Sequence, residues 1–254
     1  MKNKDYQFNY TENVVAKDKL YNQAEREYKT QKIIDVLSEH YGARLSHVRL
    51  LDMSCSTGFM ANYMSKHAKS VVGIDIDENA IKFAQEHNSR DNLDFVVMDA
   101  LHSTFAEGSF DIVICNQMYE HVPSAELLMK EIYRVLKPGG VCFFGATNRL
   151  KVIETHYGKI PFLSYLPKTL AHLYLRLLKK GTFYYENLYS YWGLKRLTEN
   201  FHVIDYTIKI IESPQKYHAE DIIHIKKFPL KIVAKLCKTF YPLLPGYIWL
   251  LQKK

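Results

Sequence analysis

Long apolar runs are missing from this sequence of 254 residues, which contains no uninterrupted apolar stretch of eighteen residues. The first ten residues, MKNKDYQFNY, are polar and aromatic and lack the apolar core of a secretory signal. Only 11 glycines and 8 prolines occur, which argues against disordered, collagen-like and repeat-built chains. These absences predict a folded protein located in the cytoplasm.

Cysteine is also scarce, and the four cysteines show no metal-ligating spacing such as Cys-x-x-Cys: Cys55, Cys115, Cys142 and Cys237. Two of them lie inside apolar, strand-like runs. We therefore expect reduced thiols, most of them in the core, and no disulfide framework.

Acidic residues are few in the C-terminal part of the chain. Residues 149–254 hold 18 Lys and Arg against 7 Asp and Glu, whereas residues 1–148 hold 16 against 20. The net charge of +7 therefore divides into +11 and −4. The basic part also carries 18 of the 34 aromatic residues. Such a surface suits a phosphate-bearing substrate, a membrane or a nucleic acid, and the alternative is a solvated basic face over a tyrosine-rich core.

The apolar pattern predicts an α/β protein. Residues 17–41 have apolar and aromatic side chains mostly at three- to five-residue steps, which indicates an amphipathic helix, bent or broken in the middle and stopped by Gly42. Apolar runs without polar alternation follow at 48–53, 70–76, 94–99, 110–116 and 141–147. Helical segments separate them near 59–67, 78–88 and 123–136. This order predicts a doubly wound, mostly parallel sheet covered by helices.

The pattern changes after Asn148. A basic aromatic tract, partly helical, continues to about residue 187 and indicates an insertion on the sheet. A helix near 190–200, a strand over 201–212, a basic helix near 229–240 and a terminal apolar run are expected after it.

Polar and small residues follow four of the expected strands. Since an open sheet of this kind binds ligands at the carboxyl ends of its strands, these loops are the place for a site. They are the small-residue turn Asp52–Gly58, the acidic Asp75, the pair Asp99 and Ala100, and the segment Asn116–His121.

These segments resemble the motifs of class I S-adenosylmethionine-dependent methyltransferases, especially the small-molecule branch with the quinone-biosynthesis O-methyltransferases. LLDMSCSTG resembles the first motif of that family, GIDIDENAIKFA the second and VVMDA the adenine-side motif. FDIVICNQMYEHV and ELLMKEIYRVLKPGG resemble the fourth and fifth. The resemblance implies seven strands, with FHVIDYTIKII and YIWLLQKK as a final antiparallel pair.

The resemblance implies four parts of the chain: a helical lid over 1–44, a cofactor-binding core over 45–148, an insertion covering the acceptor site over 149–187, and the completion of the sheet over 188–254. S-adenosylmethionine is the implied cofactor. Its methionine portion would lie on Asp52 and the 54–58 loop, with Gly58 where backbone meets ligand. The other implied contacts are Asp75 with the ribose, Ile76, Asp99 and Ala100 with the adenine, and Asn116 and Gln117 near the sulfonium.

Two residues depart from the family pattern. Ser54 and Ser56 stand where the family usually has glycine, which tolerates positive φ and close ligand approach. The departure leaves two alternatives open: a catalytically silent scaffold with a lost pocket, and a nicotinamide-dependent oxidoreductase. The second is disfavoured because a pyrophosphate needs those glycines more than a sulfonium cofactor does.

Glu120, His121 and His156 are the candidates for acceptor chemistry. An O-directed transfer needs a group that removes or polarises a hydroxyl proton, and histidine suits this task. Some family members with a Glu-x-x-Glu-His sequence bind a divalent metal at the fourth strand, but Gln117 replaces the first glutamate here, so no metal is expected. The alternatives are that Glu120 and His121 only cap a helix and that His156 lies in a surface loop.

Two segments, 161–180 and 229–251, combine apolar and aromatic side chains with Lys and Arg. They predict helices that lie on an anionic membrane or grip a lipid-like acceptor, with core packing as the alternative. Nucleic acid is disfavoured because lysine outnumbers arginine and no recognition module occurs. The interface aromatics would be Tyr165, Tyr174, Trp192, Tyr241, Tyr247 and Trp249. The expected partner is a small-molecule, sugar or lipid-linked acceptor, such as an envelope glycan intermediate or a quinone-like headgroup, met at the inner face of the membrane.

Overall fold

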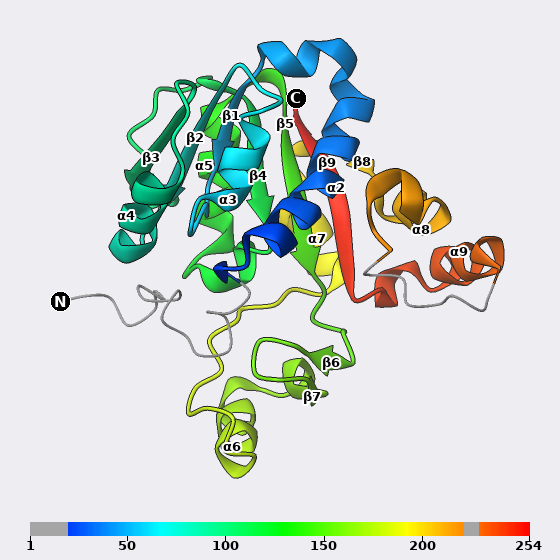
Figure 1. Cartoon of the computed structure of the whole chain (residues 1–254). Coiled ribbons are helices and arrows are strands. Elements are labelled where there is room, and N and C mark those ends of the chain that lie inside the picture. The colour runs from blue at the N-terminus through cyan, green and yellow to red at the C-terminus, as the bar shows by residue number, and fades with distance from the viewer. Residues whose placement is uncertain (1–19, 221–228) are drawn as a thin grey trace.

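A computed structural model describes residues 20–220 and 229–254 of the chain. Seven strands form one twisted sheet in the order β3-β2-β1-β4-β5-β9-β8 (Figure 1). The strands are β1 Arg49–Asp52, β2 Ser70–Asp75, β3 Leu93–Val97, β4 Phe110–Asn116, β5 Leu136–Thr147, β8 Phe201–Asp205 and β9 Gly246–Lys253. β1 to β5 are parallel, and β9 pairs antiparallel with both β5 and β8. The predicted fold and the antiparallel pair at the end of the chain are confirmed.

Helices cover both faces of this sheet, because successive side chains along its strands point alternately into two hydrophobic cores. Leu50 and Ile112 belong to one core, which contains α2 Gln23–Tyr41, α3 Phe59–Met64, α4 Glu78–His87 and α8 Thr207–Glu212. Leu51 and Val113 belong to the other, beneath α5 Ala125–Val135 and α7 Tyr191–Leu197. β1 has β2 on one side and β4 on the other, so the chain order reverses at β1 and a ligand crevice opens there.

The first correction concerns where the N-terminal helix is interrupted: Leu20 is helical, Tyr21 and Asn22 are not, and α2 begins at Gln23, so the break lies near the start of the expected helix and not in its middle. α2 runs unbroken to Tyr41, and Gly42 ends it with a φ of 57°. The helix stays continuous because Thr30, Ile33, Ile34 and Leu37 are buried along one side of it. Residues 1–19 of the expected lid lie outside the described part of the chain.

The second correction concerns the strand expected over 201–212. β8 ends at Asp205, and residues 207–212 form α8 instead. The carboxylate of Asp205 accepts a hydrogen bond from the backbone N–H of Thr207 at 2.8 Å, which turns the chain out of the sheet. Ile210 then packs into the core from a helix. The apolar residues of 207–212 suit either a strand or a helix, and the turn at Asp205 selects the helix.

The insertion after β5 folds on a small core of its own. It contains the hairpin β6 Ile153–Glu154 and β7 Ile160–Pro161, followed by α6 Lys168–Leu177. Buried Ile160, Leu163, Ala171, Leu175 and Tyr184 hold it together. Figure 1 shows it projecting beyond the end of β5.

The expected basic helix is also present, as α9 Leu230–Thr239. Within the described part of the chain, no helix has both the length and the apolar character that crossing a bilayer requires.

Candidate functional site

A cavity of about 1080 Å³ lies at the carboxyl ends of β1, β2 and β4. Its walls come from the strand-end loops, α2, the hairpin of the insertion and the start of β9. Nine of the ten expected cofactor residues line it: Asp52, Ser54, Ser56, Asp75, Ile76, Asp99, Ala100, Asn116 and Gln117. The topology therefore brings the four expected loops to one place, although the cofactor role of each residue stays a prediction.

Gly58 is the exception among these ten residues, since it does not line the cavity. It has a φ of 79°, and a Cβ there would meet the ring of Phe95 at 2.6 Å and the Cβ of Ala84 at 2.7 Å. The glycine is therefore required by close packing of the loop against β3 and α4, whatever the ligand does.

Two carboxylates organise the cofactor end of the cavity. Asp75 accepts hydrogen bonds from the backbone N–H groups of Ser56 at 2.9 Å and Asp77 at 3.0 Å. Asp52 is 4% exposed, and burial raises its pKa to about 7. Burial also raises the pKa of Asp75. The free protein thus concentrates carboxylates in a poorly solvated wall, which favours a ligand that brings positive charge or hydroxyl donors.

The surroundings of Ser56 indicate whether the acidic wall of the cavity can hold a cofactor. It has a φ of 50°, in the left-handed region where the family has glycine. Its Oγ is buried and has no hydrogen-bond partner among the described residues. A buried hydroxyl in the wall of a cavity that Asp52 and Asp75 also line fits a ligand with polar atoms at this point. The serine is therefore accommodated in the strained conformation and does not fill the cavity.

Sequence reasoning missed the basic side chains of α2. Arg26, Lys29 and Lys32 line the cavity, and the charge of Arg26 acts to lower the pKa of Asp52. Their spacing of three residues places them on one side of a helix, and this signal was present in the sequence. The lid helix thus brings cations to the same end of the cavity as the carboxylates.

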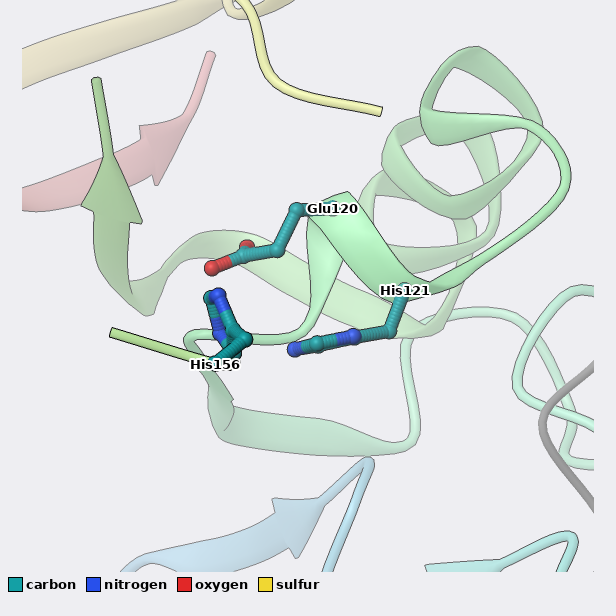
Figure 2. Close-up of side chains that lie close together, drawn as sticks. All are labelled: Glu120, His121 and His156. Carbon is teal, nitrogen blue, oxygen red and sulfur yellow. The ribbon is translucent and has the colours of Figure 1, made fainter. Parts of the chain in front are cut away.

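The three candidates for acceptor chemistry meet at the opposite end. Donor atoms of Glu120, His121 and His156 all lie within 4.8 Å of one another. Figure 2 shows the Glu120 and His121 side chains extending from one short turn toward His156 on the insertion. The two imidazole rings are 5.0 Å apart and nearly perpendicular. His156 is 18% exposed, so it is no surface-loop histidine.

Glu154 orients His156. Its Oε1 lies 2.6 Å from His156 Nδ1 and 2.7 Å from Lys151 Nζ, and its Oε2 accepts from the Tyr184 hydroxyl at 2.8 Å. Burial alone would lower the pKa of His156, but the hydrogen bond to Glu154 and the negative charges of Glu186 and Glu154 together outweigh burial and raise it. Burial would raise the pKa of Glu154, and the contacts with His156 and Lys151 lower it. No sequence pattern had marked Glu154, Lys151 or Tyr184.

The ionisable groups next to Glu154 and His156 have pKa values shifted toward their uncharged forms. Burial lowers the pKa of His121 to about 3, and it raises the pKa of Glu120 and of Glu186. Glu186 Oε1 lies 3.9 Å from His121 Nδ1. Neither carboxylate oxygen of Glu120 has a hydrogen-bond partner among the described residues.

Glu120, His121 and His156 have donor atoms of the type that holds a divalent metal. Glu154 is not part of this group, and the ammonium group of Lys151 lies 2.7 Å from its carboxylate. Gln117 lines the cavity in a left-handed turn, with a φ of 53°, and is not part of the group. The expectation of a metal-free site stays a prediction.

Comparisons with known proteins agree with this geometry. Residues 51–144 match the family model described as "Methyltransferase domain". A ubiquinone biosynthesis O-methyltransferase of Chromobacterium violaceum is 33% identical over 156 residues, covering 58% of this chain and 64% of the relative. The enzyme of the same name from Thiobacillus denitrificans is 34% identical over 146 residues, covering 54% and 61%. The chain thus spans less than two thirds of the length of these relatives.

Solved structures show the same fold. An S-adenosylmethionine dependent methyltransferase from Mesorhizobium loti matches with a TM-score of 0.55 and 14% identity, over 83% of this chain and 93% of that one. A phosphoethanolamine N-methyltransferase of Haemonchus contortus, solved with S-adenosylhomocysteine, matches with a TM-score of 0.54 and 18% identity, over 94% and 59%. At such low identity these likenesses establish the architecture alone.

Proposed function

We propose that this chain, which contains a class I S-adenosylmethionine-dependent methyltransferase domain, transfers a methyl group to an oxygen atom of a small-molecule, sugar or lipid-linked acceptor. One observation carries the proposal: a single cavity extends from the carboxylates of the strand-end loops to the histidines of the acceptor end. His121 and His156 line that cavity together with Asp52 and Asp75. Cofactor and acceptor can therefore meet inside one enclosed site.

The residues at the cofactor end fit S-adenosylmethionine, which when bound supplies an electrophilic methyl group on a sulfonium. Asp75 has two oxygens that each already accept one backbone hydrogen bond and retain a lone pair for a ribose hydroxyl. Asp52 and the basic residues of α2 offer opposite charges for the two ends of an amino acid group. Asn116 and Gln117 lie between this wall and the histidines along the strand-end loop.

His156 is suited to receive the proton of an acceptor hydroxyl. The hydrogen bond to Glu154 holds the proton of the neutral ring on Nδ1 and leaves Nε2 as the basic nitrogen. Glu154 also stabilises the imidazolium that forms when Nε2 takes a proton. His121, whose pKa is about 3, is a much weaker base and serves as a neutral wall of the acceptor pocket. Alignment of the acceptor oxygen with the methyl group of the cofactor supplies the remainder of the rate enhancement.

Two features favour oxygen over nitrogen as the target. The segment after β4 reads Asn116-Gln117-Met118-Tyr119 and lacks the aromatic-Asn-Pro-Pro pattern of amino-group methyltransferases. The curated relatives named above are O-methyltransferases, although this chain matches only part of their length. The same comparisons favour a methyltransferase over a nicotinamide-dependent oxidoreductase.

Calorimetric titration with S-adenosylhomocysteine tests cofactor binding directly. Saturable heat release is expected, and its loss is expected in Asp75→Ala but not in Asp94→Asn, which alters an exposed carboxylate of β3. No heat and no thermal stabilisation at millimolar ligand would favour the silent scaffold instead.

Methyl transfer is then measured with methyl-labelled S-adenosylmethionine on panels of soluble phenols, sugars and amines. Label is expected on hydroxyl acceptors, and His156→Ala should lower the rate by about 100-fold. His202→Ala, which removes an exposed histidine of β8, is the control. Label confined to amines, or unchanged rates in both His156→Ala and His121→Ala, would refute the proposal.

A further inference from the structure

The insertion exposes an apolar face on α6. Leu170, Leu173 and Leu177 are 51%, 52% and 72% exposed, and Phe162 before the helix is 56% exposed. These side chains line a shallow groove that is almost entirely apolar. Helix α6 buries only Ala171 and Leu175 against its own small core. The other apolar side of the helix is therefore unpartnered within the described residues.

Helix α9 repeats this arrangement. Ile232, Leu236 and Phe240 follow one another at four-residue steps and are 53%, 55% and 56% exposed. Leu243, just after the helix, is 55% exposed. Ala234 is the buried residue of α9. Two separate amphipathic helices thus present leucine and phenylalanine side chains to solvent.

Most charges around both helices are positive, although Glu212 of α8 is exposed and its Oε1 lies 2.6 Å from Lys238 Nζ of α9. No Asp or Glu occurs in residues 155–185 or in residues 222–254. Lys179 and Lys180 follow α6 closely in the chain, and Lys231 and Lys235 lie on α9. These four lysines are exposed and form no salt bridge with a described residue. Apolar surface bordered mainly by cations complements an anionic lipid headgroup layer.

Segments next to both helices line the cavity. Val152 lines the cavity and is 52% exposed, and its carbonyl accepts a hydrogen bond at 2.7 Å from the N–H of Phe162, which lines the groove of α6. Leu243 connects α9 to the same cavity. Figure 1 shows α6 beyond the end of β5 and α9 beside the start of β9.

We propose that α6 and α9 form a docking face, defined by Phe162, Leu173, Leu177, Leu236 and Phe240, that rests on an anionic membrane leaflet. The cavity mouth then faces the bilayer, and the acceptor is an amphiphile whose hydroxyl-bearing headgroup enters while its tail remains in the lipid. This choice of acceptor rests on the proposed methyl transfer, whereas the docking itself does not. A second copy of the chain is a poor occupant because its identical cationic border would repel the first.

The aromatic residues expected at the interface do not all belong to the docking face. Trp249 and Tyr247 are 1% and 2% exposed and belong to the core, so they are excluded from the docking face. Tyr165 is 40% exposed and lies next to the groove, within 5.6 Å of Phe162 between ring centroids. Trp192 is 59% exposed but lies on α7, outside the defined face.

Co-sedimentation with lipid vesicles tests the docking. The full chain is mixed with vesicles of phosphatidylcholine alone or with phosphatidylglycerol added, at low and high salt. Binding is expected only to the anionic vesicles and should weaken with salt. Leu173→Glu/Leu177→Glu and Leu236→Glu should each lower the affinity by about tenfold or more. Leu127→Glu on α5, where the leucine is 43% exposed, is the matched control and should bind like the wild type.

A second measurement separates docking from catalysis. Turnover is compared on a soluble phenol and on a long-chain alkyl phenol held in anionic vesicles, and the docking variants should lose rate only on the second. Retained titration with S-adenosylhomocysteine shows that these variants fold. Vesicle binding without any methyl transfer would refute the proposed function and leave the docking intact. Binding that ignores lipid charge, equal losses in the α5 control, or a dimer that the α6 variant dissociates would overturn the docking.

Discussion

Replacing Asp52 by Asn should make the free protein more stable and its cofactor binding weaker. Asp52 is 4% exposed, and burial raises its pKa from 3.8 to about 7. The folded state therefore binds a proton more tightly than the unfolded state between these two values, and stability falls as pH rises through this window. A shift of roughly 3 units corresponds to about 4 kcal/mol at pH 8, as an upper limit. Asparagine has nearly the same shape and carries no charge to desolvate.

The stability gain of Asp52→Asn should therefore depend on pH. Between pH 5 and pH 8 the advantage of the variant should grow by about 2.6 kcal/mol, which is a shift of several degrees in melting temperature for a chain of this length. The binding effect has the opposite sign. A ligand with a protonated amino group needs Asp52 ionised, so wild-type affinity should fall by about tenfold for each pH unit below 7.

Thermal unfolding and calorimetric titration with S-adenosylhomocysteine, each at several pH values, check both expectations. The variant should bind more weakly at pH 8, and its affinity should vary little with pH. Asp94→Asn is the control, because it removes an exposed carboxylate of β3 at no desolvation gain. If Asp52→Asn and the wild type show the same pH dependence of stability, the carboxyl is ionised in the free protein and the reasoning is refuted.

Three further predictions concern the acceptor end and the lid. Glu154→Gln should lower turnover by about 10- to 100-fold and move the alkaline rise of the pH–rate profile to lower pH, and an unmoved profile would refute its role in orienting His156. A chelator should leave turnover and melting temperature unchanged, whereas manganese that stabilises the wild type but not Glu120→Gln would establish a metal site. Glu39→Gln should lower the free energy of unfolding by about 1 kcal/mol above pH 4.5. The difference should vanish below about pH 2, where Glu39 itself is protonated. Chemical denaturation at several pH values measures this, and a difference that does not change with pH would contradict it.

The cofactor end could be predicted from the sequence because its residues follow strands that are short, apolar and easily recognised. Asp52, Asp75 and Asn116 lie at the ends of β1, β2 and β4, and parallel pairing brings such ends together without further information. The error over 201–212 has a local cause. A capping contact from Asp205 ends the strand, and apolar periodicity does not report such contacts.

The acceptor end could be predicted only in part, because its residues come from segments with no shared periodicity. His121 follows β4 and His156 belongs to the insertion, and both were candidates as histidines near strand ends. Glu154 escaped notice because an isolated glutamate in a hairpin carries no pattern of its own. Its importance comes from burial beside Lys151 and Tyr184, and that burial is a tertiary property.

The two ends of the cavity differ in how their charges are balanced, and this difference bears on the order in which the ligands bind. At the acceptor end Glu154 is neutralised in the free protein by Lys151 and His156, so that end is prepared before any ligand arrives. At the cofactor end burial keeps Asp52 partly protonated, so ionisation there depends on a cationic ligand. A cationic ligand that ionises Asp52 also adds negative charge to this wall of the cavity. Cofactor binding is therefore expected to precede acceptor binding, and product-inhibition kinetics with S-adenosylhomocysteine would show competition with the cofactor alone.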